Sequence, residues 1–358
     1  SFKHRKPRGV QRGADPVPRF FSSAVNALAV KPRPTLQPPA LVAHADWSID
    51  PKKRSMARAV RTSNGGYIAL APEPVSNLED LFARLNAASG VGETAFVGFD
   101  FPLGVPRAYA KAARIDRFMT ALPKFGRGTW KDFYAPANGQ EDISPRRPFY
   151  PNRPGGTRRA HLIDGLKLNG PDELFRLCDH PTNLRAAANP MFWTMGAQQV
   201  GKAAISGWRD LIAPAIRRDP AFHVWPFEGR LTELLTRPGI TVAEVYPGEI
   251  YGHLKLQIAA SNKSKLNSAH RKEDAPRLLE WAIQNNVQLS AALASDIRDG
   301  FGEGADGEDR FDATVGLLGM LNVIFGHRTS GEPADAVVRQ IEGWILGLDA
   351  KMLQHPSD

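Results

Sequence analysis

The chain has 358 residues, of which 42% are hydrophobic and 23% charged, enough apolar content to bury a sizeable core as one large domain or two modest ones. No apolar run approaches the roughly 18 residues of a membrane span, and the first residues lack the apolar centre of a secretory signal, which argues against a membrane role. The single cysteine, Cys178, excludes an internal disulfide, and no Cys/His cluster has zinc-ligand spacing, so we expect a cytoplasmic protein.

The net charge of +9 is concentrated in two segments. Residues 1–40 hold eight Lys or Arg against one acidic residue, and residues 106–160 hold twelve against four. Basic segments of this kind suit a polyanionic partner such as DNA or RNA. The first segment is also rich in Pro and Ser, so it is equally typical of a basic, largely disordered tail.

An antiparallel meander is predicted to open the ordered part of the chain. Residues 41–47 form a short apolar run that reads as a buried strand. Two more strand-like runs follow at 56–61 and 67–70, on either side of Asn64-Gly65, a strong hairpin-turn signal. These runs predict three consecutive antiparallel strands.

A helix and a further strand extend this pattern before it breaks. Ser76 and Glu79 have capping-box spacing, and apolar residues then recur at helical period, which predicts a helix over about 77–88. Residues 95–101 predict another buried strand. Residues 102–185 are rich in Pro, Gly and Arg and predict an irregular, basic insertion.

Helices and short strands are predicted beyond the insertion. A long helix is expected from residue 195 to about 212, where it should end because Pro214 removes a backbone donor and clashes with the preceding turn. Strands at 222–227 and 240–245 enclose a short helix near residue 231, and helices should dominate from there. The order of elements predicts an α/β fold with a mixed sheet flanked by helices and a helical C-terminal part.

Four aspartates have the placement expected of a metal site. Asp46 and Asp100 each close an apolar strand run, and strand ends are where acids converge in an α/β sheet. Asp309 and Asp312, three residues apart at the start of an apolar helix, share one face. Two-metal phosphodiester hydrolysis needs such hard oxygen ligands to hold cations about 3.5–4 Å apart. Capping of the helix N-terminus is the alternative interpretation of the second pair.

Glu244 and His44 are weaker candidates. Glu244 lies in an otherwise apolar strand run, where a charge is costly unless it is paired or bound to metal. An edge strand with Glu244 facing water is the alternative. His44 shares a strand face with Asp46, which allows either a role in proton transfer or a hydrogen-bonded buried histidine.

Several motifs together resemble a known family. They are His44-Ala45-Asp46-Trp47-Ser48, Val97-Gly98-Phe99-Asp100-Phe101-Pro102-Leu103-Gly104, Met195-Gly196-Ala197-Gln198-Gln199-Val200-Gly201-Lys202, Ala243-Glu244-Val245-Tyr246-Pro247 and Asp309-Arg310-Phe311-Asp312-Ala313. In order and spacing, over about residues 41–326, they resemble the domain-of-unknown-function 429 family, which is generally predicted to be a ribonuclease-H-like nuclease.

The resemblance implies a fold, a metal and a set of ligands. It implies a ribonuclease-H-like domain over 41–350 in which Asp46, Asp100 and Asp309 or Asp312 hold Mg²⁺ or Mn²⁺. Glu244 would be an additional ligand or would orient water. One departure concerns Asp100, because the second acid of many ribonuclease-H-like nucleases is Glu, whose side chain is one methylene longer.

Basic and aromatic side chains are candidates for nucleic-acid binding. The basic candidates are Lys263, Lys265, Arg271, Arg146, Arg147, Arg158 and Arg159, which could meet phosphates or form a solvated surface. The aromatic candidates are Trp130, Phe133, Tyr134, Phe149 and Tyr150, which could stack on bases or anchor the insertion. Gln198, Gln199 and Lys202 share a helical turn that could touch substrate or be an ordinary polar face.

The leading hypothesis is therefore a metal-dependent nuclease that acts on DNA or RNA. A phosphotransferase of the actin-like ATPase type is one alternative, although it needs glycine-rich phosphate hairpins and only Asn64-Gly65-Gly66 is available. A non-catalytic nucleic-acid-binding scaffold with a vestigial site is the other.

Overall fold

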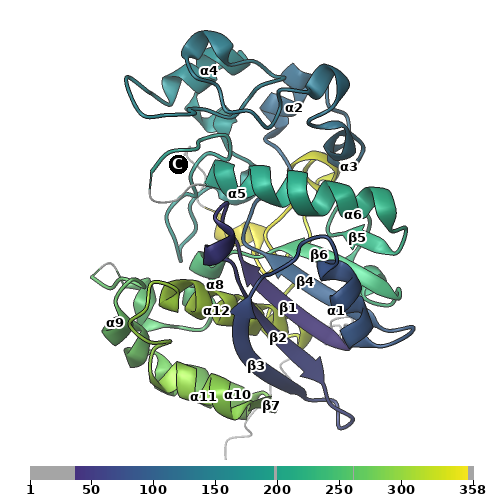
Figure 1. The fold of residues 1–358 in the computed structure, drawn as a ribbon, viewed down its shortest axis with the longest axis vertical. Coiled ribbons are helices and arrows are strands. Elements are labelled where there is room, and N and C mark those ends of the chain that lie inside the picture. The colour runs from purple at the N-terminus through teal and green to yellow at the C-terminus, as the bar shows by residue number, and fades with distance from the viewer. Residues whose placement is uncertain (1–36, 197–199, 261, 354–358) are drawn as a thin grey trace, which may run out of the picture. The chain divides into compact units, whose positions relative to one another are not determined.

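A seven-stranded mixed sheet lies at the centre of the chain (Figure 1). The computed structural model describes residues 37–196, 200–260 and 262–353, all within one compact unit, Pro34–Asp358. Most of the predicted tail, residues 1–36, lies outside the described residues. The strands in spatial order are β5 (Phe222–Val224), β6 (Gly239–Glu244), β4 (Thr94–Phe99), β1 (Leu41–Asp46), β2 (Ser55–Arg61), β3 (Tyr67–Pro74) and β7 (Val287–Leu289).

The predicted meander and the parallel strands beside it are confirmed. β1, β2 and β3 pair antiparallel, and β4, β6 and β5 continue from β1 in parallel. The turn between β2 and β3 places Gly65 at φ +82°, which glycine adopts without a steric cost, and the Thr62 N–H donates to the Gly66 carbonyl at 2.8 Å. The chain is thus an α/β protein with a mixed sheet, as its order of elements predicts.

Helices cover both faces of the sheet, and each face has its own apolar core (Figure 1). Strand residues alternate between the two cores, so that Ala43 and Val97 face one while Val42 and Phe96 face the other. The first core includes α1 (Leu81–Ser89), α2 (Arg107–Ala113), α3 (Phe118–Ala121), α4 (Ala160–Leu166), α5 (Val200–Ser206) and α6 (Ala213–Arg218). The second includes α7 (Leu231–Leu234), α8 (Pro247–His253), α10 (Ala275–Gln284), α11 (Ala291–Arg298) and α12 (Gly307–Ile324), with α9 (Ser268–Glu273) beside it.

Helix α12 packs directly on β1 and β2 and is buried along nearly its whole length. Gly316 allows this close approach, because a Cβ there would lie 2.1 Å from the ring of His44 on β1. Asp309 and Asp312 therefore lie in the first two turns of a helix that is buried along nearly its whole length.

The predicted insertion holds short helices joined by irregular segments, and its aromatic residues belong to the core on one face of the sheet. Trp130, Phe133, Tyr134, Phe149 and Tyr150 are all buried. The Phe133 ring stacks on Phe125 with centroids 3.7 Å apart and lies near Trp208. The anchoring interpretation is confirmed for these five residues, and the prediction that they stack on bases is wrong because their rings already pack against one another.

Two predicted boundaries are wrong for local reasons. The helix expected to end near residue 212 continues to Arg218, because a π-helical turn, Gly207–Ile212, precedes Pro214 and gives its ring room. Helix α1 begins only at Leu81, and its N-cap Asp80 makes no side-chain capping bond. Helices dominate after residue 245, as predicted, and β7 is a short strand among them. Within the described ranges, no helix is both long and apolar enough to cross a membrane.

Candidate active site

Two acidic residues lie at the carboxyl ends of neighbouring strands. Asp46 is the last residue of β1, and Asp100 follows β4 directly. β1 and β4 pair in parallel with Ala45 opposite Phe99, so both carboxylates leave the same edge of the sheet. The two side chains are in hydrogen-bonding contact, and the Trp47 N–H donates to Oδ1 of Asp100 at 2.7 Å. The predicted adjacency of Asp46 and Asp100 is confirmed.

The first two turns of α12 bring further acids to the same place. Asp312 accepts hydrogen bonds from the Tyr251 hydroxyl and the Lys265 ammonium. The charges of Asp309 and Asp312 both act on Asp46. Within the described part of the chain, neither aspartate accepts a hydrogen bond from a backbone N–H, so side-chain capping does not explain the pair.

A cleft of about 480 Å³ opens over these side chains. Its charged and phenolic lining consists of Asp46, Asp50, Asp100, Asp179, Glu244, Glu308, Asp309, Asp312, Lys53, Lys202, Lys265, Arg176, Tyr246 and Tyr251. All five carboxylates predicted from the sequence therefore line one cleft, although they come from three strand ends and one helix.

The acids of the cleft resist ionisation. Burial, followed by the charges of Asp100 and Asp312, raises the pKa of Asp46 well above its ordinary value. Burial likewise raises the pKa of Asp100. Burial and then the charge of Glu308 raise the pKa of Asp309 to about 6. Desolvated like charges have this effect, and a bound cation would reverse it.

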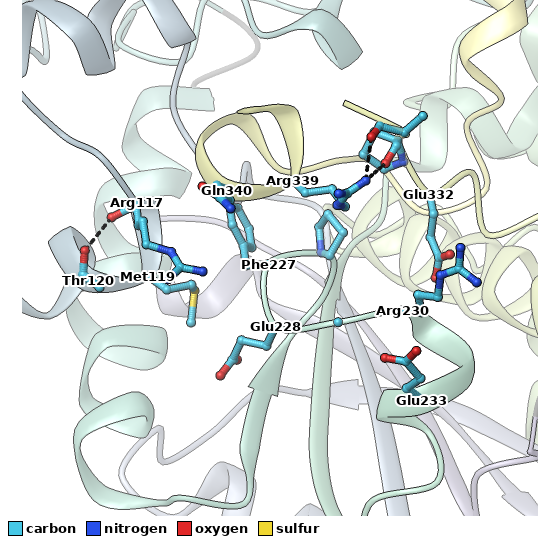
Figure 2. Close-up of a pocket in the computed structure, with 14 residues that line it drawn as sticks. Arg117, Met119, Thr120, Phe227, Glu228, Arg230, Glu233, Glu332, Arg339 and Gln340 are labelled. Carbon is cyan, nitrogen blue, oxygen red and sulfur yellow. Dashed lines mark hydrogen bonds between the residues drawn. The ribbon is translucent and has the colours of Figure 1, made fainter. Parts of the chain in front are cut away.

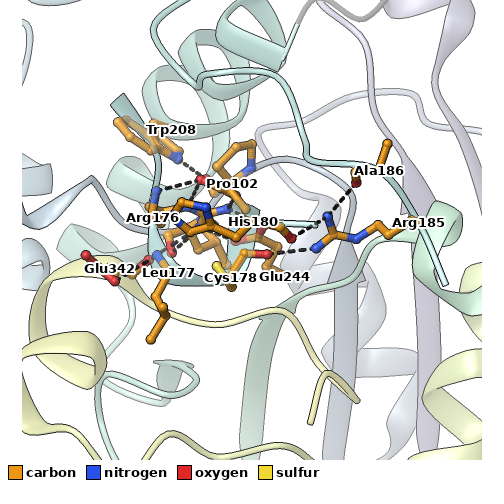
Figure 3. A network of polar contacts seen from close by, with 12 residues as sticks. Pro102, Arg176, Leu177, Cys178, His180, Arg185, Ala186, Trp208, Glu244 and Glu342 are labelled. Atoms are coloured by element: carbon orange, nitrogen blue, oxygen red, sulfur yellow. Dashed lines mark hydrogen bonds and ion pairs between the residues drawn. The ribbon is translucent and has the colours of Figure 1, made fainter. Parts of the chain in front are cut away.

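Glu244 is held by a buried arginine (Figure 3). Its two oxygens accept hydrogen bonds from Arg176 at 2.6 and 2.7 Å, and Oε2 also accepts from the Leu103 N–H at 2.7 Å. β6 lies between β5 and β4, and Glu244 is only 4% exposed, so the edge-strand alternative is wrong. The role of Glu244 as an additional ligand stays a prediction, with both of its oxygens already engaged by protein donors.

Arg176 joins the insertion to the rest of the site (Figure 3). It also pairs with Asp179 at 2.7 Å and donates to the Glu342 carbonyl at 3.3 Å. The Glu342 carboxylate in turn accepts from the Leu177 N–H at 3.0 Å and pairs with Arg107 at 2.7 Å. Such a buried network is costly to break, so it fixes the position of Glu244.

The basic residues near the cleft have three different roles. Lys263 pairs with Glu273 at 2.7 Å, outside the carboxylate cluster. Lys265 lies inside the cluster, bonded to Asp312. Arg271 is 2% exposed and donates to backbone carbonyls, including that of Gly300 at 2.7 Å. The predicted phosphate contact is therefore wrong for Arg271, which holds two loops together.

The basic residues of the insertion are mostly engaged within it. Arg146 lies over the Trp130 ring at 3.6 Å, and Arg147 donates to two backbone carbonyls of its own segment at 3.0 Å. Arg158 and Arg159 are both exposed, and Arg159 bonds an asparagine side chain at 2.7 Å. Arg158 and Arg159 are therefore more open to a phosphate than Arg146 and Arg147.

His44 is a buried structural residue. Its Nδ1 lies 3.1 Å from the carbonyl oxygen of Ala313 on α12, and the residue is fully buried. Burial lowers its pKa to about 4, so the ring is neutral at pH 7. The interpretation as a hydrogen-bonded buried histidine is confirmed.

Several charged and phenolic residues of the cleft were not among the predicted site residues, including Glu308, Tyr251, Lys53 and Arg176. Glu308 neighbours Asp309, and Tyr251 lies one helical turn beyond Pro247, so both were within reach of pattern reasoning. Lys53 and Arg176 carry no sequence signal, because they reach the cleft from irregular segments. Gln198 and Gln199 lie outside the described residues, and Lys202 lines the cleft.

The glycine turn that a phosphotransferase would need lies at the wrong end of the sheet. Asp46 pairs with Ser55 at the start of β2, whereas Leu41 pairs with Val60 at its end. The turn that contains Gly65 follows the end of β2 and therefore lies at the opposite ends of the strands from the carboxylates. This position weighs against the actin-like ATPase alternative.

A second cleft of about 770 Å³ lies beside the end of β5 (Figure 2). Three arginines and three glutamates line it, and two of the glutamates are already bonded: Glu228 accepts from the Val224 N–H at 2.6 Å and Glu332 from the Leu231 N–H at 2.5 Å. None of the residues predicted from the sequence lines this cleft.

The donor set of the first cleft fits a hard divalent cation. Carboxylate oxygens are what Mg²⁺ and Mn²⁺ prefer, and burial and neighbouring like charges raise the pKa values of Asp46, Asp100 and Asp309, which a bound cation would lower. Among residues 37–196, 200–260 and 262–353, however, no three His, Cys, Asp or Glu side chains are already arranged as a ligand set. Comparisons with family models, curated proteins and solved structures found no match.

Proposed function

We propose that this protein is a metal-dependent nuclease of ribonuclease-H-like fold that hydrolyses phosphodiester bonds of DNA or RNA. The observation that carries the proposal is the convergence of Asp46, Asp100, Asp309 and Asp312 in one cleft. An antiparallel meander continued by parallel strands, with acids at the ends of β1 and β4, supports the ribonuclease-H-like assignment.

Those four aspartates would hold Mg²⁺ or Mn²⁺. When bound, the ions would activate water and stabilise charge on the leaving oxygen. The chain itself contributes the positions of the acids: Asp46 and Asp100 are fixed by strand pairing, and Asp309 and Asp312 by a buried helix. The Trp47 N–H holds Asp100 in place.

The basic side chains of the cleft would bind the substrate. Lys53 and Lys202 line it alongside the acids and supply positive charge for a phosphate backbone. Arg158 would extend this grip from the insertion. Salt-sensitive binding of nucleic acid is expected from such contacts.

The test is titration of Mn²⁺ and Mg²⁺ into the wild-type chain and Asp46→Asn, followed by incubation of both with single- and double-stranded DNA and RNA. We expect metal binding and cleavage in the wild type and neither in the variant. Exposed Asp116→Asn is the matched control and should cleave normally. Full activity of Asp46→Asn would refute the assignment, and metal-independent binding without turnover would favour the scaffold alternative.

A further inference from the structure

Lys265 places an ammonium group inside the carboxylate cluster. It donates a hydrogen bond to Oδ2 of Asp312, and its Nζ lies 4.0 Å from the Glu308 carboxylate. Its charge also acts on Asp46, Asp100 and Asp309. The ammonium therefore partly neutralises the same aspartates that would hold a divalent ion.

The backbone of Lys265 is held by a hydrogen bond, whereas its side chain is partly exposed to the cleft. Buried Arg271 donates to the Lys265 carbonyl and also to the carbonyls of Gly300 and Gly302, at 2.7 and 2.6 Å, in the loop before α12. One arginine thus ties the Lys265 segment to the helix that carries Asp312. The Lys265 side chain is 41% exposed and lines the cleft.

We propose that Lys265 is an internal counter-cation that competes with the divalent ion for Asp312. In the metal-free protein the Lys265 ammonium is bonded to the Asp312 carboxylate. Metal binding requires the ammonium to leave that carboxylate and move into the cleft, where it would face the substrate phosphate. This inference rests on the proposed metal site and adds to it a residue that sets the metal affinity.

Lys53 provides a matched control. It lines the same cleft, and its charge acts on Asp309. Within the described residues, however, its side chain donates no hydrogen bond to a carboxylate. Lys53→Met therefore removes one positive charge from the cleft without removing a competitor from a ligand.

The experiment measures Mn²⁺ affinity of the full chain by calorimetry for the wild type, Lys265→Met and Lys53→Met. We expect Lys265→Met to bind Mn²⁺ at least about tenfold more tightly and Lys53→Met to change the affinity less than about threefold, since only the first loses a direct competitor. Equal gains in both variants would show a general charge effect and overturn the proposal.

Lysine acetylation of the wild type, read by mass spectrometry, gives a second measurement that needs no variant. Addition of Mn²⁺ should increase labelling of Lys265 relative to Lys53, and unchanged relative labelling would overturn the proposal. Mn²⁺ binding to the wild type without a gain in Lys265→Met refutes the competition alone. If neither the wild type nor Lys265→Met binds Mn²⁺, the proposed function is refuted as well. If only Lys265→Met binds Mn²⁺, the competition is supported but a metal-dependent activity of the wild type is contradicted.

Discussion

Replacing Asp46 by Asn should stabilise the metal-free protein even though it removes a proposed metal ligand. Asp46 is 8% exposed and lies beside Asp100, so burial and a neighbouring carboxylate both oppose its ionisation in the folded protein. Two like charges about 4 Å apart cost roughly 4 kcal/mol at an effective dielectric constant of about 20. Lys265 offsets part of this cost. We therefore expect Asp46→Asn to raise the free energy of unfolding by about 2 kcal/mol at pH 8.

The pH dependence gives this prediction its sign. Burial raises the pKa of Asp46 in the folded state, so the stability that its protonated form contributes is lost as pH rises through that raised pKa. Asn does not titrate in this range. The advantage of Asp46→Asn should therefore grow from about pH 4 upward and be smaller at pH 5 than at pH 8.

Urea unfolding with a chelator present, at pH 5 and pH 8, measures this difference. The exposed Asp116→Asn variant is the control and should match the wild type. Without the chelator, Mn²⁺ at about one hundred times its dissociation constant should add about 2.7 kcal/mol to the free energy of unfolding of the wild type and nothing to that of Asp46→Asn. An Asp46→Asn protein no more stable than the wild type at pH 8, with an unchanged control, would refute the repulsion among the carboxylates.

Three further outcomes are expected. Arg176→Met should lower the free energy of unfolding by about 3–5 kcal/mol in urea titrations, because it leaves Glu244 buried without its partner. Adding Glu244→Gln to this variant should recover part of the loss. A loss below about 1 kcal/mol would contradict a stabilising role for the network. Gly316→Ala should lower the melting temperature despite the helix propensity of Ala, because the new methyl meets the His44 ring. Mn²⁺ affinity, measured by calorimetry, should rise between pH 5 and pH 8 as ligands such as Asp309, with a pKa of about 6, lose their protons. An affinity that does not change with pH would exclude Asp309 from the metal site.

The strand ends were predictable because their signals are local. An apolar run that stops at an acid predicts both a buried strand and the edge at which its last side chain emerges, so Asp46 and Asp100 could be placed before any pairing was known. Asp309 and Asp312 followed from helical spacing in the same way. The pairing of β1 with β4, which joins these acids, depends on the whole sheet.

The basic and aromatic residues were less predictable because their roles depend on tertiary contacts. Arg271 and an exposed arginine look alike in a sequence, and only the positions of the carbonyls around it show that its guanidinium is buried. The aromatic residues of the insertion follow no helical or strand period, so neither their burial nor their partners could be read from spacing. Strand β7 has only three residues and depends on its contact with β3.

Placing two acids at the start of α12 has a consequence for how the cleft exchanges with solvent. Because α12 is buried almost throughout and packs on β1 and β2, its amides should open only when the whole unit unfolds. Asp309 and Asp312 then belong to the same cooperative folding unit as Asp46. Local fraying would not disassemble this cluster, so hydrogen exchange at α12 should report global stability, and any ion held there would dissociate from an intact fold.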